Sequence, residues 1–228
     1  MRIAIFSDIH AKALHLDPLF TDIDRYRVDE VWCLGDLTGY GAGVDADETA
    51  RQVRKRCRLV LSGNHDWTCT ERSTEFIDFL PPWLRDTLLD ARGHLSPEMF
   101  AWLRDLPAED RRWGINAFHG SYEDAITGAV DYPDQLKATV GSGRIAVVGH
   151  THIPAAKTIQ RRKLKSYYPR HDQVIDISKG MWVLNPGAAG LRQSEHRQHV
   201  VDRRPGWMLL DLANMTARWR RFDGVGQA

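Results

Sequence analysis

The sequence contains no apolar run that approaches the ~18 consecutive residues a membrane-spanning helix needs, so no membrane partner is expected. Cysteine is scarce: Cys33, Cys57 and Cys69 are an odd number, without the spacing of a metal-binding motif. The N-terminus also lacks the long apolar region and the small-residue cleavage site of a secretory signal. These absences predict a cytoplasmic protein whose thiols are reduced.

Internal repeats, low-complexity tracts and linker-like segments are missing as well. The composition is that of a globular chain, with 43% hydrophobic and 27% charged residues. Eight Trp, seven Phe and six Tyr supply a sizeable core, which excludes disorder of the whole chain. A length of 228 residues fits one large domain, so we expect a single domain over residues 1–228.

The charge is distributed unevenly along the chain. Residues 157–221 contain 14 Lys and Arg against 5 Asp and Glu, a net charge of +9, which leaves −8 for the rest of a chain whose total is +1. Residues 157–170 include six basic and no acidic side chains, together with Tyr167 and Tyr168. Such a tract can bind single-stranded nucleic acid, but an exposed hairpin with charged edges is the commoner explanation. Nucleic acid is therefore the less favoured partner.

Short apolar runs alternate with helix-period segments near the N-terminus. Runs at residues 2–6, 30–34 and 59–61 predict strands. Apolar spacings of three and four between Leu16 and Tyr26 predict a helix, and a second helix is expected at about residues 45–56. This alternation indicates a mainly parallel sheet covered by helices.

The segment at about residues 67–112 breaks the alternation and predicts a helical insert. It has helical spacing at Trp83, Leu84 and Leu88, and Ser96-Pro97-Glu98 is typical of a helix start. Beyond it, strands are expected at residues 115–118 and 144–148, with a helix near residues 131–139 between them. Later runs predict antiparallel strands, with a hairpin turn at Ala213-Asn214; they cover residues 155–159, 174–177, 181–184, 207–212 and 216–222.

Five of the predicted strands are followed at once by Asp, Asn or His side chains. The five segments are Ser7-Asp8-Ile9-His10, Gly35-Asp36, Gly63-Asn64-His65-Asp66, His119-Gly120-Ser121 and Gly149-His150-Thr151-His152. In open α/β sheets the carboxyl ends of the strands are where ligands bind. The chain therefore presents its polar side chains where a site is expected.

These residue types indicate metal binding. Carboxylate and imidazole donors suit Mn, Fe, Zn, Ni or Co, and no thiolate is placed to compete. The spacing of two in Asp8-x-His10 and in His150-x-His152 permits a shared site. With His65 set aside, the candidates are two carboxylates, one amide and four imidazoles, more than one ion needs. Two ions that share a carboxylate can clamp the oxygens of a phosphoryl displacement and activate a bridging water.

In their order along the chain, these motifs resemble those of the calcineurin-like metallophosphoesterases. Asn185-Pro186-Gly187 is similar to a turn near the end of the small bacterial and archaeal phosphodiesterase-type members. The resemblance extends over about residues 2–222. It implies an α/β fold, a four-layer α-β-β-α sandwich of two mixed sheets, with the helical insert at about residues 67–112.

The resemblance also implies roles for the site residues. One divalent ion would be held by Asp8, His10, Asp36 and His152, and the other by Asp36, Asn64, His119 and His150, so that Asp36 bridges the two. His65 would contact the phosphate or protonate the leaving oxygen. Manganese is the first expectation for both ions, ahead of Fe, Zn, Ni or Co. Asp66 is either a catalytic partner of His65 or a turn residue, and Tyr40 either stacks on a substrate base or packs its loop.

Two positions depart from the family pattern. The eukaryotic-type protein phosphatases carry an Asp three residues after the bridging Asp, where it pairs with the catalytic His, and this chain has Gly39 there. The family turn is usually Asn-Pro-Gly-Ser, whereas Ala188 follows Gly187 here. His65 must therefore find another partner, such as Asp66, or act without one.

The expected function is a two-metal phosphoesterase in which a metal-bridging hydroxide attacks a phosphodiester or phosphomonoester. A phosphorylated small molecule, with a nucleotide-type diester first, is the expected substrate. The alternatives are a protein phosphatase, which Gly39 disfavours, and a nucleic-acid end-processing enzyme, which depends on the basic tract. A non-catalytic scaffold of the same fold is a further alternative, and the intact set of metal-binding residues argues against it.

Overall fold

The computed structural model describes residues 1–72, 77, 80–190 and 204–223. Its α-helices are α1 (Leu16–Asp24), α2 (Ala46–Arg56), α3 (Asn64–Cys69), α4 (Pro82–His94), α5 (Pro97–Arg104) and α6 (Pro133–Val140). Two short 3₁₀ helices, η1 (Ala13–His15) and η2 (Gly43–Asp45), precede α1 and α2. Within the described residues, no helix combines the length and the apolar character needed to cross a membrane.

The strands form two six-stranded mixed sheets. The first has the order β3 (Leu59–Val60), β2 (Glu30–Cys33), β1 (Arg2–Phe6), β11 (Gly206–Asp211), β12 (Thr216–Arg221), β9 (Val174–Asp176). The second has the order β4 (Glu109–Arg112), β5 (Ile115–Phe118), β6 (Ile145–Val147), β10 (Trp182–Asn185), β7 (Ala155–Gln160), β8 (Lys163–Tyr167). In each sheet three consecutive strands are parallel, β1–β3 in the first and β5, β6 and β10 in the second, and antiparallel strands extend them.

The alternation of side chains along the strands explains why the sheets pack in layers. On β1, Ile3 and Ile5 point into a core that lies between the two sheets, whereas Ala4 and Phe6 point to the opposite face. All four are fully buried, so β1 is covered on both faces. Because successive side chains of a strand alternate between faces, such a strand needs one layer on each side.

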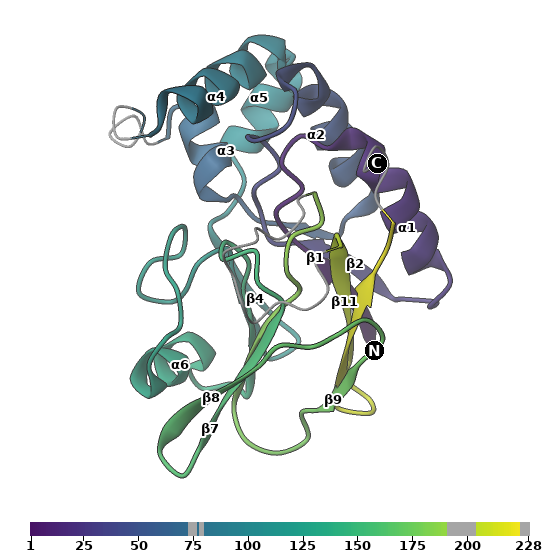
Figure 1. Cartoon of the computed structure of the whole chain (residues 1–228), viewed down its shortest axis with the longest axis vertical. Helices are drawn as coiled ribbons and strands as arrows, with labels where there is room; N and C mark the ends of the chain where they lie inside the picture. Colours follow the sequence, from purple (N-terminus) through teal and green to yellow (C-terminus); the bar gives the residue numbers. More distant parts are fainter. Residues whose placement is uncertain (73–76, 78–79, 191–203, 224–228) are drawn as a thin grey trace.

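Helices supply the outer layers. Apolar residues of α1, α2, α4 and α5 pack with Ala4 and Phe6 in one cluster, and Leu136 and Val140 of α6 pack on the outer face of the second sheet. Figure 1 shows α1 on one side of the molecule and α6 on the other, with the sheets between them. The predicted four-layer α-β-β-α sandwich is therefore confirmed.

Most predicted strands are present, and the main correction concerns the helical insert. Helices α4 and α5 fall inside the expected segment of residues 67–112, but its last four residues form strand β4, which pairs antiparallel with β5. Strand β8 completes the charged hairpin that was expected within residues 157–170. Strand β4 is an edge strand made of charged residues, and such a strand lacks the alternating apolar pattern because solvent rather than core surrounds it.

Candidate metal centre

The polar side chains singled out from the sequence come together where the two sheets end. Asp8 and His10 follow β1, Asp36 follows β2, and Asn64 begins α3 just after β3. From the second sheet, His119 follows β5, and the loop with His150 and His152 follows β6. Backbone hydrogen bonds link these loops within each sheet: the N–H of Asp8 donates to Gly35 O at 3.0 Å and that of Gly149 to His119 O at 2.8 Å. Neighbouring parallel strands thus deliver all seven side chains to one end of the sandwich.

The backbone is unusual at five of these positions. The φ angles lie between 51° and 60°, in the left-handed region, at Asp8, His10, Asp36, His150 and His152. Non-glycine residues seldom adopt this conformation, although Asp and His do so more often than most. Residues held in sparsely populated backbone regions cluster at functional sites, where the surrounding structure maintains the strain.

One group consists of Asp8, His10, Asp36 and His152. Each offers a donor atom that lies within 4.8 Å of the others, the spacing of residues that can hold one metal ion. The Nε2 atoms of His10 and His152 are 3.0 Å apart, and His152 Nε2 lies 3.4 Å from Asp8 Oδ1. The three residues other than His152 are almost completely buried.

A second group adjoins the first through Asp36. Asp36 Oδ2 lies 3.8 Å from His10 Nε2 on one side and 3.3 Å from His119 Nε2 on the other. The amide oxygen of Asn64 lies 3.3 Å from His119 Nε2 and 3.0 Å from His150 Nδ1. The donors of Asp36, Asn64, His119 and His150 therefore converge, and Asp36 belongs to both groups.

Backbone carbonyls orient two of the histidine rings. The Nδ1 of His10 donates to Thr38 O at 2.9 Å, and the Nδ1 of His119 donates to Leu34 O at 2.8 Å. Because a carbonyl only accepts, the proton sits on Nδ1 and the Nε2 atoms face the site. This is the second contact that metal-binding histidines usually make. These acceptors could not be found from the sequence, since any residue supplies a carbonyl.

Burial and mutual attraction shift the pKa values of the site. Burial would raise the pKa of Asp8 and of Asp36, but attraction to neighbouring histidines lowers both below the usual range. Burial would lower the pKa of His119, but Asp36 outweighs it and raises the value to about 9. The carboxylates therefore remain ionised although they are buried.

This donor set fits divalent metal ions. Neither carboxylate oxygen of Asp8 has a hydrogen-bond partner within the described part of the chain, although the side chain is fully buried. A buried carboxylate is costly unless donors or a metal ion satisfy it. Carboxylate, amide and imidazole donors without thiolate suit Mn, Fe, Zn, Ni or Co. The side chains present thus fit the divalent metal ions that were expected from the sequence.

His65 lies against the centre with one nitrogen free. Its Nε2 is 3.9 Å from Asp36 Oδ2, and its Nδ1 has no hydrogen-bond partner among the described residues. A Cβ on Gly39 would collide with this Nδ1, so an Asp at that position would not fit the present arrangement. Burial lowers the pKa of His65, and the ring is therefore neutral at neutral pH.

Asp66 does not pair with His65, contrary to one of the two sequence interpretations. Its carboxylate accepts hydrogen bonds from the backbone N–H groups of Leu37 and Thr38, from the Thr38 hydroxyl and from the Gly63 N–H. Burial and the nearby Asp36 raise its pKa to about 6, although the hydrogen bonds oppose this. Asp66 therefore positions the loop that carries Asp36.

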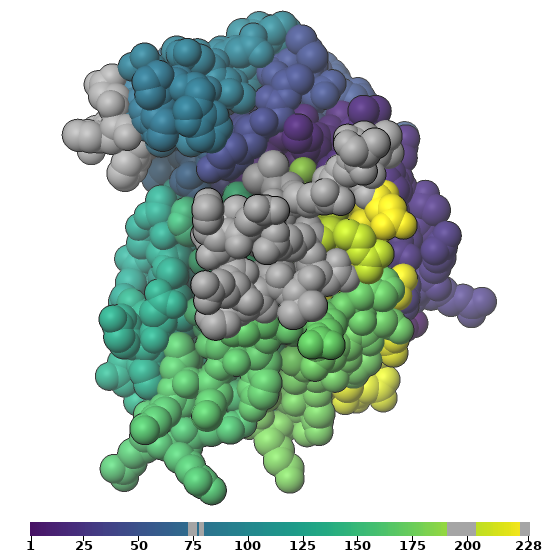
Figure 2. Space-filling view, viewed as in Figure 1, coloured from purple at the N-terminus to yellow at the C-terminus, as the bar shows by residue number. Residues whose placement is uncertain are grey.

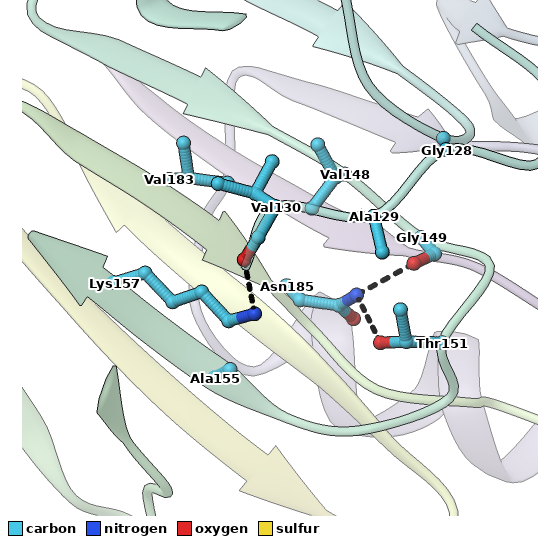
Figure 3. Close-up of a pocket in the computed structure, with 11 residues that line it drawn as sticks. Gly128, Ala129, Val130, Val148, Gly149, Thr151, Ala155, Lys157, Val183 and Asn185 are labelled. Carbon is cyan, nitrogen blue, oxygen red and sulfur yellow. Dashed lines mark hydrogen bonds between the residues drawn. The ribbon is translucent and has the colours of Figure 1, made fainter. Parts of the chain in front are cut away.

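The Asn185-Pro186-Gly187 turn holds the loop of His150 and His152. Figure 3 shows the Asn185 amide donating to Gly149 O and to the Thr151 hydroxyl, at 2.6 and 3.2 Å. The same view shows Lys157 donating to Val130 O across a small cavity. After the turn, the backbone N–H of Ala189 donates to Ser7 O at 2.8 Å, which links this segment to the loop of Asp8.

Known proteins share this architecture. A family model of the calcineurin-like phosphoesterase superfamily domain matches residues 1–203. An uncharacterised protein of Methanocaldococcus jannaschii is 26% identical over 193 residues, which are 82% of this chain and 76% of that protein. A metallophosphoesterase of Sphaerobacter thermophilus superposes with a TM-score of 0.82 at 27% identity, over 98% of this chain and 89% of its own. A hypothetical protein of Pyrococcus horikoshii has a TM-score of 0.73 at 17% identity, over 99% and 89%, and at that identity it shows the fold alone.

Proposed function

The chain belongs to the calcineurin-like phosphoesterase superfamily and is a phosphoester hydrolase, and from this premise we propose that it works with two divalent metal ions. Asp8, His10, Asp36 and His152 would hold one ion, and Asp36, Asn64, His119 and His150 the other. Manganese is our first choice among the ions that nitrogen and oxygen donors suit, ahead of Fe, Zn, Ni or Co. The substrate we propose is a small phosphodiester of the nucleotide type, ahead of phosphomonoesters.

The position of Asp36 supports this proposal more than any other observation. Its Oδ2 lies between His10 and His119, which come from different groups and different sheets. Its Oδ1 accepts a hydrogen bond from the backbone N–H of His65 at 2.9 Å, which fixes the orientation of the carboxylate. A carboxylate held in this way adjoins both groups of donors and would help to hold both ions.

The protein side chains bind and orient the substrate. Two bound ions would supply Lewis acidity and a nucleophile at neutral pH. His65 can donate one hydrogen bond to a phosphoryl oxygen even as a neutral ring, because one of its nitrogens always carries a proton. The nitrogen that faces the centre is Nε2, 3.9 Å from Asp36 Oδ2, whereas Nδ1 is buried against Gly39 and has no acceptor among the described residues. Asp66 keeps the Asp36 loop in place.

The first test is hydrolysis by the manganese-loaded protein. We expect turnover of bis(p-nitrophenyl) phosphate, with slower turnover of p-nitrophenyl phosphate. Asp36→Asn should lower kcat/KM at least about 100-fold, because it removes a carboxylate shared by both ions. It should also reduce the metal content measured by elemental analysis.

Asp134→Asn is the matched control. Asp134 lies on α6, its side chain is 92% exposed, and Lys137 on the same helix is its one ion-pair partner among the described residues. The same change of charge should leave kcat/KM and metal content unaltered. Full activity of Asp36→Asn, or of the chelator-treated wild type, would refute the two-metal proposal.

The structure gives less support to the other candidate functions. Protein phosphatases pair their catalytic His with an Asp, and Gly39 leaves no room for one beside His65. The basic tract forms the β7–β8 hairpin, which projects at the lower end of the molecule in Figures 1 and 2. Because β7 leads away from the centre by roughly 17 Å, this hairpin does not line the site.

A further inference from the structure

Tyr40 lies in the loop after Asp36 and faces the histidines of the centre. Its ring centroid is 4.7 Å from that of His10, 4.8 Å from His65 and 6.1 Å from His152. Its φ of 53° places it in the left-handed region, where a bulky side chain is uncommon. The strained backbone therefore holds an aromatic ring next to the residues proposed to bind the metals and the phosphate.

Trp83 extends this aromatic surface outwards. It lies at the start of α4, and its ring is 5.7 Å from that of Tyr40, with an angle of 38° between the planes. The residue is 57% exposed, whereas its neighbours Leu84 and Leu88 on α4 are buried. The core accounts for Leu84 and Leu88, but it does not account for an exposed indole at the rim of a polar site.

A cavity opens beside His65, the residue that Tyr40 contacts. Its volume is about 150 Å³, and it is lined by Asn64, His65, Thr68, Leu80, Leu88 and Thr127. This volume is smaller than that of a pocket for a drug-sized ligand, so the cavity has room for only part of a substrate. None of these residues is Asp, Glu, Lys or Arg. Next to the charged centre there is thus a neutral space, bordered by Leu80 and Leu88 from the same segment as Trp83.

We propose that Tyr40 and Trp83 form a stacking surface for a planar aromatic group carried by the phosphoester substrate. The inference rests on the proposed function, because it takes the phosphate to lie at His65 and the metal-binding residues. Aromatic rings stack on planar groups without requiring a particular base, and each such contact contributes about 1–3 kcal/mol. The neutral walls of the cavity disfavour a charged substituent there. The surface would therefore select nucleotide or aryl esters over alkyl esters.

The test compares ligands that differ only in the ring. Phenylphosphonate and methylphosphonate have carbon–phosphorus bonds, so a phosphoesterase cannot hydrolyse them. Calorimetric titration of the manganese-loaded protein should give a dissociation constant for phenylphosphonate about 10-fold below that for methylphosphonate. Trp83→Ala should reduce this ratio to less than about threefold.

Trp113→Ala is the matched control. Trp113 is 60% exposed, a fraction similar to that of Trp83, and lies between β4 and β5, where its Nε1 donates to Glu30. This variant should keep the wild-type ratio between the dissociation constants of the two phosphonates. A gain in affinity that Trp83→Ala leaves unchanged would overturn the stacking surface.

A third ligand shows whether the aromatic group that stacks is a nucleobase or a simple aryl group. The carbon–phosphorus analogue of adenosine 5′-monophosphate places its ring one sugar further from phosphorus than phenylphosphonate does. A Trp83-dependent gain for this analogue assigns the surface to a nucleobase, and a gain for phenylphosphonate alone assigns it to an aryl group. If methylphosphonate itself fails to bind in the presence of manganese, the proposed function fails; if it binds and neither ring adds affinity, only the stacking surface fails.

Discussion

At the scale of single residues, the centre depends on glycines that leave room for the functional side chains. A Cβ on Gly63 would collide with the carboxylate and the backbone N–H of Asp36, and one on Gly35 would come within 2.9 Å of His119 Nδ1. The loops after β2 and β3 can therefore approach each other only if these positions carry no side chain. This close approach lets Asp36 accept its hydrogen bond from His65.

Gly63→Ala should damage both stability and metal binding. The added methyl group must displace Asp36, and overpacking of this kind costs about 2–3 kcal/mol. We expect this loss in the free energy of unfolding, measured by urea denaturation, together with a weaker affinity for manganese.

Gly93→Ala is the control for Gly63→Ala. Gly93 is an exposed residue of α4, and no described atom outside its own helix turn lies within 4 Å of an added Cβ. Alanine is the better helix former, so this variant should be more stable by up to about 1 kcal/mol. Equal destabilisation by both variants would contradict the steric explanation.

At the scale of elements, one buried carboxylate joins α1 to the first sheet. Asp22 accepts hydrogen bonds from Trp207 Nε1 on β11 at 3.0 Å and from two nitrogens of Arg220 on β12. Its side chain is only 8% exposed, and that of Arg220 14%. The helix is thus attached to strands almost 200 positions further along the chain.

Asp22→Ala should destabilise the protein by about 2–3 kcal/mol, because it leaves a buried indole N–H without its acceptor and leaves the Arg220 guanidinium with Asp172 as its remaining carboxylate partner. Urea denaturation would measure the loss. Asp24→Ala, which removes an exposed carboxylate paired with Arg56, should cost at most about 1 kcal/mol. A small effect of Asp22→Ala would show that α1 is held by its apolar face alone.

A second contact between elements makes stability depend on pH. Asp47 on α2 accepts hydrogen bonds from the N–H and hydroxyl of Ser96, the residue before α5, and from Arg51. Burial opposes ionisation, but these bonds outweigh it and lower the pKa of Asp47. A lowered pKa in the folded state means that the stabilisation is complete above about pH 4 and is lost as the pH falls through the folded value.

Asp47→Asn should therefore flatten the loss of stability below about pH 4, as measured by thermal unfolding at a series of pH values. Asp86→Asn, on the exposed face of α4, controls for the removal of one negative charge. If Asp47→Asn and the wild type lost stability equally as the pH falls below about 4, this account would be contradicted.

At the scale of the whole molecule, bound metal ions would join the two sheets. Asp8, His10, Asp36 and Asn64 come from loops of the first sheet, and His119, His150 and His152 from loops of the second. Ions that bind only the folded arrangement stabilise it by mass action, by about 2.7 kcal/mol at a concentration 100 times the dissociation constant. For a domain of this size that corresponds to a rise in Tm of about 5–10 °C.

The expected outcome is therefore a higher Tm with manganese than with a chelator, measured by calorimetry at one protein concentration. Asp36→Asn should lose most of the shift, and Asp134→Asn should keep it. A Tm that does not respond to any of Mn, Fe, Zn, Ni or Co would argue against metals between the sheets.

The sequence by itself determined most strands and the residues that gather at the strand ends, whereas the four layers were expected from the resemblance of its motifs to a known family. Alternating apolar residues and the motifs after each strand are local features, and local features can be interpreted without coordinates. Edge strand β4 was not predicted, because its side chains are all charged and carry no apolar pattern.

Only the tertiary structure decided what each polar residue touches. Asp66 contacts the backbone of the Asp36 loop rather than His65, and the carbonyls of Thr38 and Leu34 orient His10 and His119. Tyr40 and Trp83 are brought together from separate segments, 43 positions apart. Such contacts depend on the relative placement of loops from different strands. Backbone acceptors cannot be predicted from the sequence, because every residue type supplies the same carbonyl.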